Sequence, residues 1–115
     1  MQFLLTVTLG EHAGAPPTEL RGAMTNFVHD ETRAGTFVIT GGLAGRADGA
    51  RMRLSTAGLI RSEPQLPIHG YAVVECPALE QATEVATRLL RLHQDFVPDW
   101  EVACDVRQIV TDCLP

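Results

Sequence analysis

His93 is the side chain best suited to acid–base chemistry. It ends an amphipathic segment, residues 79–93, whose apolar residues recur at the helical period. The same period puts His93 on the apolar stripe, so we expect its imidazole to point inward at a helix end, where the helix dipole stabilises a cation. Asp95, two residues later, could orient the ring. The alternative is a histidine that only caps the helix by bonding its last carbonyl groups.

A second imidazole, His69, opens the alternating run 69–75 and shares one strand face with Tyr71. Side chains two residues apart on a strand point to the same side of a sheet. A Tyr-His pair at this spacing could hold a phenol or a carbonyl group by general acid–base contacts. The alternative for His69 is a solvent-exposed position at a strand edge.

Glu31 is a carboxylate that the helical period brings close to apolar positions of segment 18–34, among them Met24 and Phe27. A carboxylate held against an apolar surface is a typical general base, so Glu31 is a third catalytic candidate. The alternative places Glu31 beyond the core, in the last turn of the helix.

The candidates for substrate binding are polar side chains in or near strands and loops: Arg107, Tyr71, Arg61, Ser62 and Asp95. Arg107, in the final strand, could hold a carboxylate or an enolate oxygen with two hydrogen bonds. A structural pair with Asp105 or Glu75 is its alternative. Arg61 and Ser62 lie in a predicted loop, where binding residues often collect. Ser62 lacks a G-x-S-x-G context, so we do not expect a nucleophilic serine.

The sequence indicates neither a metal site nor a cofactor site. Its four histidines, at positions 12, 29, 69 and 93, show no HxH or HExxH spacing. The glycine-rich run 41–45 is not followed by a helical pattern, so it does not match a dinucleotide fingerprint. All nine basic residues are arginines, which excludes Schiff-base, P-loop and lysine-base chemistry. We therefore expect no metal and no cofactor.

Length and charge narrow the function classes further. The 115 residues fit a single domain, with 45% hydrophobic and 20% charged residues. The formal charge of −5 argues against nucleic-acid binding, which needs a clustered basic surface. Cys76, Cys104 and Cys113 form no CxxC pair and leave an odd count, which suits buried thiols in a reducing cytosol.

The apolar start of the chain, residues 1–9, lacks a positive leading region, and threonines interrupt it. We interpret it as a first strand and not as a secretory signal. No apolar run approaches the roughly 18 residues that a membrane span requires. We expect a cytoplasmic protein that contacts neither membrane nor nucleic acid.

The elements that position these residues follow from periodicity. Strands are predicted where residues alternate or β-branched residues gather, at 2–9, 36–40, 51–54, 69–75 and 100–109. Helices are predicted at 18–34 and 79–93. Pro64 and Pro67 indicate an irregular segment over 57–67, and segment 51–54 is the expected partner of 36–40.

This order predicts an α+β fold: a ferredoxin-like βαββαβ arrangement with an antiparallel sheet. Two helices of this length cover only one face of a four-stranded sheet. The strands carry apolar residues on both faces, for example Leu4 opposite Phe3 and Leu5. A second subunit stacked sheet on sheet is the simplest cover, so we expect a homodimer that forms a dimeric α+β barrel.

The residues also resemble a known family. The opening Met1-Gln2-Phe3-Leu4-Leu5-Thr6-Val7, the helix ending before Gly35 and the run Gly41-Gly42-Leu43 are similar to YCII-related proteins of the DGPF group. The similarity continues from residue 59 through Gly70-Tyr71, in the helix 78–92, and in Trp100-Glu101-Val102 and Val106-Arg107-Gln108-Ile109. The chain departs from the family at its Asp-Gly-Pro-Phe signature, where it has Arg61-Ser62-Glu63-Pro64-Gln65.

The resemblance implies a dimeric α+β barrel that covers residues 1–115. It also implies work on small molecules, since one studied type eliminates chloride from a hydroxylated aromatic ring with a His-Asp pair. We expect a cofactor-free isomerase, cyclase or lyase acting on an aromatic or polyketide-like substrate. His93 or His69 would be its acid–base group, with Arg107 or Arg61 on an oxyanion. The alternative is a non-catalytic ligand-binding or assembly module, which the altered signature favours.

Overall fold

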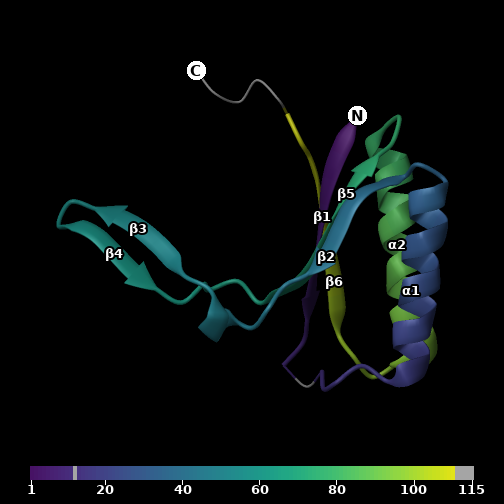
Figure 1. The fold of residues 1–115 in the computed structure, drawn as a ribbon, viewed down its shortest axis with the longest axis horizontal. Coiled ribbons are helices and arrows are strands. Elements are labelled where there is room, and N and C mark those ends of the chain that lie inside the picture. Colours follow the sequence, from purple (N-terminus) through teal and green to yellow (C-terminus); the bar gives the residue numbers. More distant parts are fainter. Residues whose placement is uncertain (12, 111–115) are drawn as a thin grey trace.

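The computed structural model describes residues 1–11 and 13–110, so His12 and Cys113 lie outside the described residues. The described chain forms two α-helices, six strands and one short 3₁₀ helix (Figure 1). In chain order these are β1 (Gln2–Leu9), α1 (Thr18–Arg33), β2 (Phe37–Gly42), η1 (Arg46–Asp48), β3 (Arg51–Ser55), β4 (Gly58–Ser62), β5 (Ile68–Glu75), α2 (Leu79–Phe96) and β6 (Val102–Gln108).

Four strands form one antiparallel sheet in the order β2-β5-β1-β6. With the β3–β4 hairpin set aside, the chain runs β-α-β-β-α-β, and the strand order is that of a ferredoxin-like sheet. Both helices pack on the same face of this sheet (Figure 1). The predicted α+β class and element order are therefore confirmed.

The core lies between the helices and the sheet, because alternation on the central strand β1 sends every second side chain toward the helices. Phe3 and Leu5 of β1 and Val74 of β5 are almost completely buried there. Phe27 of α1 packs edge-on against Phe37 of β2, with ring centroids 5.7 Å apart. Helix α2 contributes its apolar stripe of Ala82, Val85, Ala86 and Leu89.

The helix ends follow local chemistry. Helix α1 stops at Arg33, and Gly35 adopts φ +81°, a left-handed conformation that glycine reaches without strain and that commonly ends helices. Helix α2 continues past the predicted end at residue 93 and stops at Phe96. Among the described residues, neither helix is long and apolar enough to cross a membrane.

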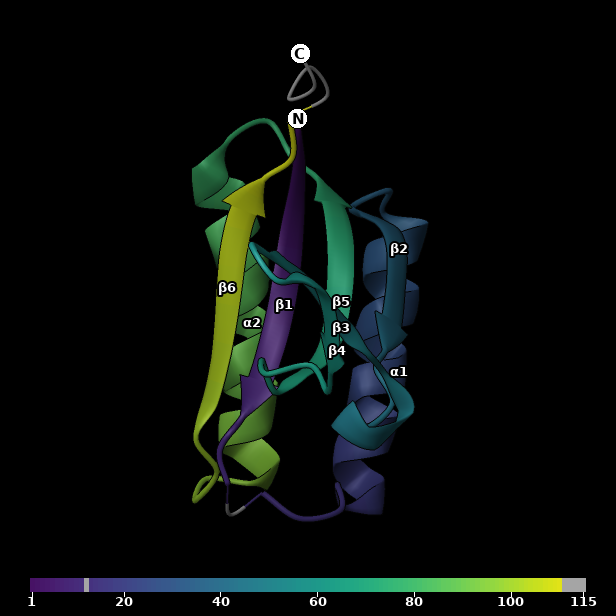
Figure 2. The ribbon, with the colours of Figure 1, turned by 90° about the vertical axis from the view of Figure 1, so that its left-hand side faces the viewer.

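The hairpin β3–β4 is the main departure from the sequence prediction. Segment 51–54 is a strand, as predicted, but it pairs with β4 and not with β2. The prediction of an irregular segment over 57–67 is wrong for its first half, because Pro64 and Pro67 come after β4 has ended. The hairpin leaves the sheet on the face that the helices do not cover (Figures 1 and 2).

Two of the cysteines lie in the described residues, and both are free thiols. Cys76 is buried in the core, and Cys104 of β6 is half-buried and packs against the core cluster. Burial raises the pKa of the Cys104 thiol from 9.0 to about 11, and the neighbouring Asp105 carboxylate adds to the rise. Burial also raises the pKa of Cys76.

Because of these raised pKa values, the stability of the fold should vary with pH in the alkaline range. Between pH 9 and 11 the unfolded chain loses the Cys104 proton while the folded chain keeps it, so the unfolded state binds fewer protons. The free energy of unfolding should therefore fall as the pH rises through this window. Urea unfolding under reducing conditions at pH 8, 9 and 10 measures the fall, which should be shallower for Cys104→Val. Equal slopes for the two proteins would contradict this account.

Candidate functional site

The helices and the sheet border a cavity of about 600 Å³, partly open to solvent, near the end of the domain where α2 leads into β6. Its walls are mainly apolar and come from all the core layers: Leu5 and Val7 of β1, Leu20 and Met24 of α1, Phe37 of β2 and Trp100. Cavities of this volume and lining are typical sites for small organic ligands. The polar groups along the walls therefore decide what chemistry the cavity can carry.

His93 is the buried polar side chain of this cavity. It lies on the buried stripe of α2, one turn after Leu89, and only 7% of its surface is exposed. Its Nδ1 lies 2.9 Å from the carbonyl oxygen of Leu89. A carbonyl oxygen only accepts, so Nδ1 carries the proton and donates it to Leu89.

This bond determines what His93 presents to the cavity. In the neutral ring, a protonated Nδ1 leaves a lone pair on Nε2. Within the described part of the chain, every fully buried polar side-chain atom has a hydrogen-bond partner. The hydrogen bond of His93 is made by Nδ1, so Nε2 is not fully buried and can accept a proton or a hydrogen bond from a molecule in the cavity that His93 lines.

His69 also borders the cavity, through an irregularity in β5. Val7 lies opposite Gly70 and Thr8 lies opposite Ile68, so His69 is an extra residue, a β-bulge. The bulge breaks the alternation that would put His69 on one face with Tyr71. His69 is exposed and lies at the cavity margin, whereas His93 is buried inside it.

Thr40 is a further polar side chain on the cavity wall, and its hydrogen bond is already used. Its Oγ1 donates to the carbonyl oxygen of Tyr71 at 2.8 Å, which ties β2 to β5. Tyr71 borders the cavity as well, but its ring lies against Gly41, directly opposite on β2. A Cβ built on Gly41 would lie 3.1 Å from that ring, so Gly41 leaves the space that Tyr71 occupies.

The other predicted site residues lie away from the cavity. Glu31 accepts a bond from Arg88 of α2 at 2.6 Å, and this ion pair joins the two helices. Arg107 lies opposite Leu4, on the face of the sheet that the helices leave open, and is exposed. Glu75, the alternative partner of Arg107, receives a bond from the Met1 amino group at 3.0 Å.

Asp95, Arg61 and Ser62 do not line the cavity either. Asp95 is exposed on the last turn of α2, and the expected orienting role at His93 is filled by the Leu89 carbonyl. Arg61 and Ser62 lie in β4, on the projecting hairpin. The structure thus brings His93 and His69 to one cavity, whereas the register of β5 puts the Tyr71 side chain on the open face with Val73, and the remaining candidates lie on other surfaces.

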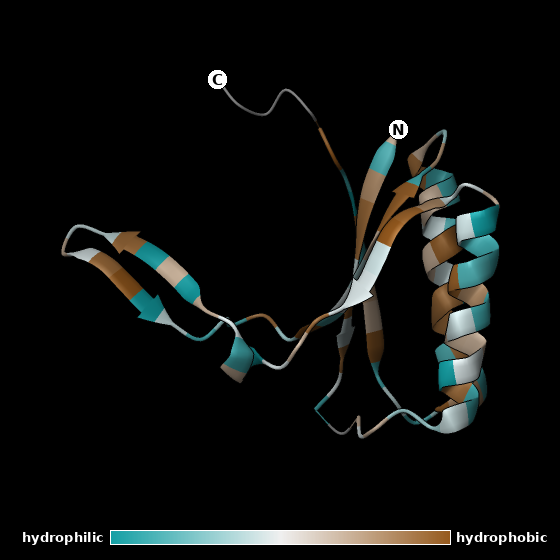
Figure 3. Ribbon diagram, in the orientation of Figure 1, coloured by the Kyte–Doolittle hydropathy of each residue, from teal (hydrophilic) through white to brown (hydrophobic). Residues whose placement is uncertain are grey.

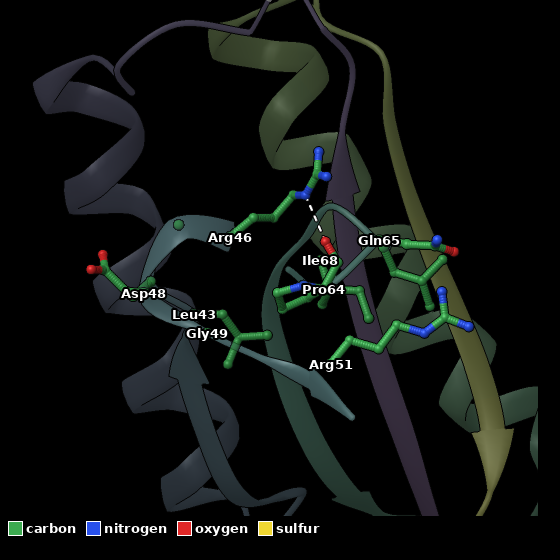
Figure 4. A pocket seen from close by; sticks show the side chains of 11 residues that line it. Leu43, Arg46, Asp48, Gly49, Arg51, Pro64, Gln65 and Ile68 are labelled. Carbon is green, nitrogen blue, oxygen red and sulfur yellow. Dashed lines mark hydrogen bonds between the residues drawn. The ribbon is translucent and has the colours of Figure 1, made fainter. Parts of the chain in front are cut away.

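A second hollow, of about 770 Å³, lies at the base of the hairpin (Figure 4). Arg46 crosses its rim and donates from Nε to the carbonyl oxygen of Pro64 at 2.7 Å. The rest of the wall is largely apolar and includes Leu43, Leu66 and Ile68. Periodicity in the sequence does not indicate this hollow, because it forms between two segments that are distant in the chain, residues 43–51 and 64–68.

Trp100 is another residue that the sequence analysis did not assign to a site. The sequence predicts it at the start of the last strand, but it precedes β6 and lines the cavity beside α2.

Within residues 1–11 and 13–110, no three His, Cys, Asp or Glu side chains gather closely enough to hold a metal ion. Neither a comparison with models of known protein families nor one with curated proteins finds a match to this chain.

The hydrogen bond of His93 predicts a specific tautomer. In the neutral ring, Nδ1 should carry the proton, although free imidazole side chains favour the proton on Nε2. Two-bond ¹H–¹⁵N NMR correlations of the histidine rings distinguish the two forms directly. His29, which lies outside the cavity on α1, should show the ordinary form in the same spectrum. A protonated Nε2 on the neutral His93 ring would contradict the Leu89 bond.

Proposed function

We propose that the protein is a cofactor-independent enzyme that moves a proton on a small, largely apolar carbonyl or phenolic molecule. The reaction class would be isomerisation, cyclisation or elimination, on an aromatic or polyketide-like substrate. The observation that carries this proposal is the buried His93 imidazole in the lining of a largely apolar cavity, whose Nδ1 is held by Leu89 and whose Nε2 is left to accept a proton. A positioned histidine of this kind is the usual general base.

The proposed mechanism follows from the positions of the two histidines. A substrate in the cavity would place an acidic C–H or O–H group against Nε2 of His93, which takes the proton. The resulting imidazolium is stabilised by the Leu89 carbonyl and by the C-terminal end of α2, whose dipole favours a cation. The negative charge left on the substrate oxygen would then be stabilised by a hydrogen bond from His69 at the cavity margin.

The cavity walls favour a second candidate function, a non-catalytic binding module. Apart from the two histidines and Arg21, the lining is largely apolar, and its threonines, Thr25 and Thr40, already donate to backbone carbonyl groups. In a binding module, Nε2 of His93 would simply accept a hydrogen bond from a ligand hydroxyl group. The two functions share the pocket and differ in whether a proton is transferred to and from carbon.

Deuterium exchange distinguishes the enzyme from the binding module. Enolisable aryl ketones and phenols that raise the melting temperature would be incubated with the protein in D₂O and followed by ¹H NMR. The enzyme should accelerate exchange beside the carbonyl, and His93→Gln should slow this exchange by roughly 100- to 10,000-fold. His29→Gln, which alters a histidine of α1 outside the cavity, is the matched control and should keep the full rate.

The results of the exchange experiment distinguish the two functions and test the role of His93. Ligands that bind without any exchange would favour the binding module. Exchange that survives His93→Gln would overturn the assigned role of His93. Native mass spectrometry of freshly purified protein, followed by denaturation, can supply a bound compound to extend the panel.

We also propose that the chain forms a homodimer by stacking the open faces of two sheets, as a dimeric α+β barrel. The open face carries apolar residues that need a cover, including Leu4 of β1, Val73 of β5 and Ile39 of β2. The βαββαβ order supports distant kinship with the YCII-related proteins that the sequence resembles. In such a dimer Arg107 and Tyr71 would lie in the interface.

The dimer can be tested by mass. Light scattering coupled to size exclusion should give about 25 kDa, twice the 12.5 kDa of the chain. Ile39→Asp would put a charge on the open face, where Ile39 is 53% exposed, and should shift the protein toward the monomer. Leu79→Asp, on the first turn of α2, should leave the mass unchanged. A wild-type mass of 12.5 kDa would overturn the dimer.

A further inference from the structure

The lining of the 600 Å³ cavity differs in charge from the rest of the chain. The chain has 14 carboxylate side chains against nine arginines, which gives the formal charge of −5. Among the described residues that line the cavity, however, there are one arginine, Arg21, and two histidines, but no aspartate or glutamate. Because an unpaired charge is costly to bury, an apolar wall explains why carboxylates are missing. It does not explain why a guanidinium is present.

Arg21 lies at the solvent-exposed margin of the cavity. It is the fourth residue of α1, it is exposed, and it follows the buried Leu20, which lines the cavity as well. One turn later Thr25 also borders the cavity, but its hydroxyl group donates to the carbonyl oxygen of Arg21 at 2.9 Å. The guanidinium is therefore the polar group of α1 that is left to meet a ligand.

The stability of the helix does not account for Arg21. A positive side chain is unfavourable near the start of a helix, because the helix dipole puts partial positive charge there. The two ion pairs found within the described residues join Met1 to Glu75 and Glu31 to Arg88, so neither involves Arg21. An anion bound from outside the chain would offset the charge of this guanidinium.

Arg21 and His93 occupy the same end of the domain. Helix α1 begins and helix α2 ends at the lower end of the views in Figures 1 and 2, and both residues line the one cavity. His93 is buried whereas Arg21 is exposed, so the imidazole lies deeper than the guanidinium. A ligand that contacts both must have its anionic group at the margin and its reacting group inside.

The walls of the cavity favour a ligand with an apolar ring. Figure 3 shows that the helices turn hydrophobic residues toward the sheet and hydrophilic residues outward. Phe27, Phe37 and Trp100 contribute aromatic rings to the lining. Aromatic side chains pack favourably against other rings, either stacked with an offset or edge to face. A ring in the ligand would therefore lie between its anionic group and the interior of the domain.

We propose that the substrate is an aromatic oxo acid, whose carboxylate binds Arg21 at the cavity margin while the carbon beside its carbonyl group meets His93. This proposal rests on the proposed function for the carbonyl chemistry, and it adds the charged group that orients the substrate. A guanidinium can hold a carboxylate with two parallel hydrogen bonds, so it determines the direction of the bound molecule as well as its affinity. Arg21 would thus select acids over neutral ketones of the same shape.

A carboxylic acid and its ester test the contact. The probes are benzoylpropionate, in which two methylene groups separate an aryl ketone from a carboxylate, and its methyl ester, which lacks the charge. Trp100 is the single tryptophan of the chain and lines the cavity, so quenching of its fluorescence measures binding. The wild type should bind the acid roughly tenfold more tightly than the ester, because the ester forms no charge-assisted bond. Arg21→Gln should lose this preference and bind the ester with little change.

Arg33→Gln is the matched control, since it removes the same charge from the last turn of α1, outside the cavity. It should keep the wild-type preference for the acid. That preference should also shrink as the salt concentration rises, because an exposed charge is screened by ions. Both side chains are exposed, so both variants should keep the wild-type circular dichroism spectrum.

The failure of this proposal differs from the failure of the proposed function. Equal affinities of the wild type for acid and ester would overturn the carboxylate contact and leave the role of His93 standing, since neutral ketones and phenols test that role by deuterium exchange. A preference that survives Arg21→Gln would overturn the assignment of Arg21. No quenching by either probe would overturn the aromatic oxo acid as the ligand. A preference that Arg21→Gln removes, without any exchange, would support the anion contact and overturn the enzyme.

Discussion

The whole structure depends on the central strand β1, which is hydrogen-bonded on both sides. Its antiparallel pairing with β5 and β6 fixes which side chains face the helices. Phe3 and Leu5 point to the covered face and Leu4 to the open one, so a shift of one residue would exchange the two surfaces. The buried layer, the cavity and the open face all follow from this register.

The bulge in β5 is a local departure from this regular register, and it lies beside the cavity. Without it, His69 would lie on the open face, on the other side of the sheet from His93. One extra residue moves His69 to the margin of the space where His93 is buried. Bulges recur beside functional sites because they redirect one side chain while the surrounding strand pairs stay intact. The sheet can therefore keep its pairing while both histidines border one cavity.

Periodicity is sufficient to predict the core elements. The helical spacing of Ala82, Val85, Ala86 and Leu89 predicts that His93 is buried, and it is. The predictions that fail are those that depend on contacts between distant segments, because local sequence patterns do not indicate such contacts. Glu31 is a candidate base because its own helix places it near apolar residues, but Arg88 of the other helix binds it. The segment before Pro64 is predicted to be irregular, although the pairing of Leu59 with Leu54 makes it a strand.

The shape of the cavity favours a ligand. Its lining is mostly apolar, and because the space is partly open to solvent, water contacts these side chains when the cavity holds no ligand. Removing apolar surface from water is favourable, by roughly 25 cal/mol for each Å² buried. A molecule that fills the space and bonds Nε2 of His93 would bury this surface, and it would stabilise the folded chain by mass action. An apolar cavity that retains one buried imidazole therefore favours a ligand-binding role over a purely structural one.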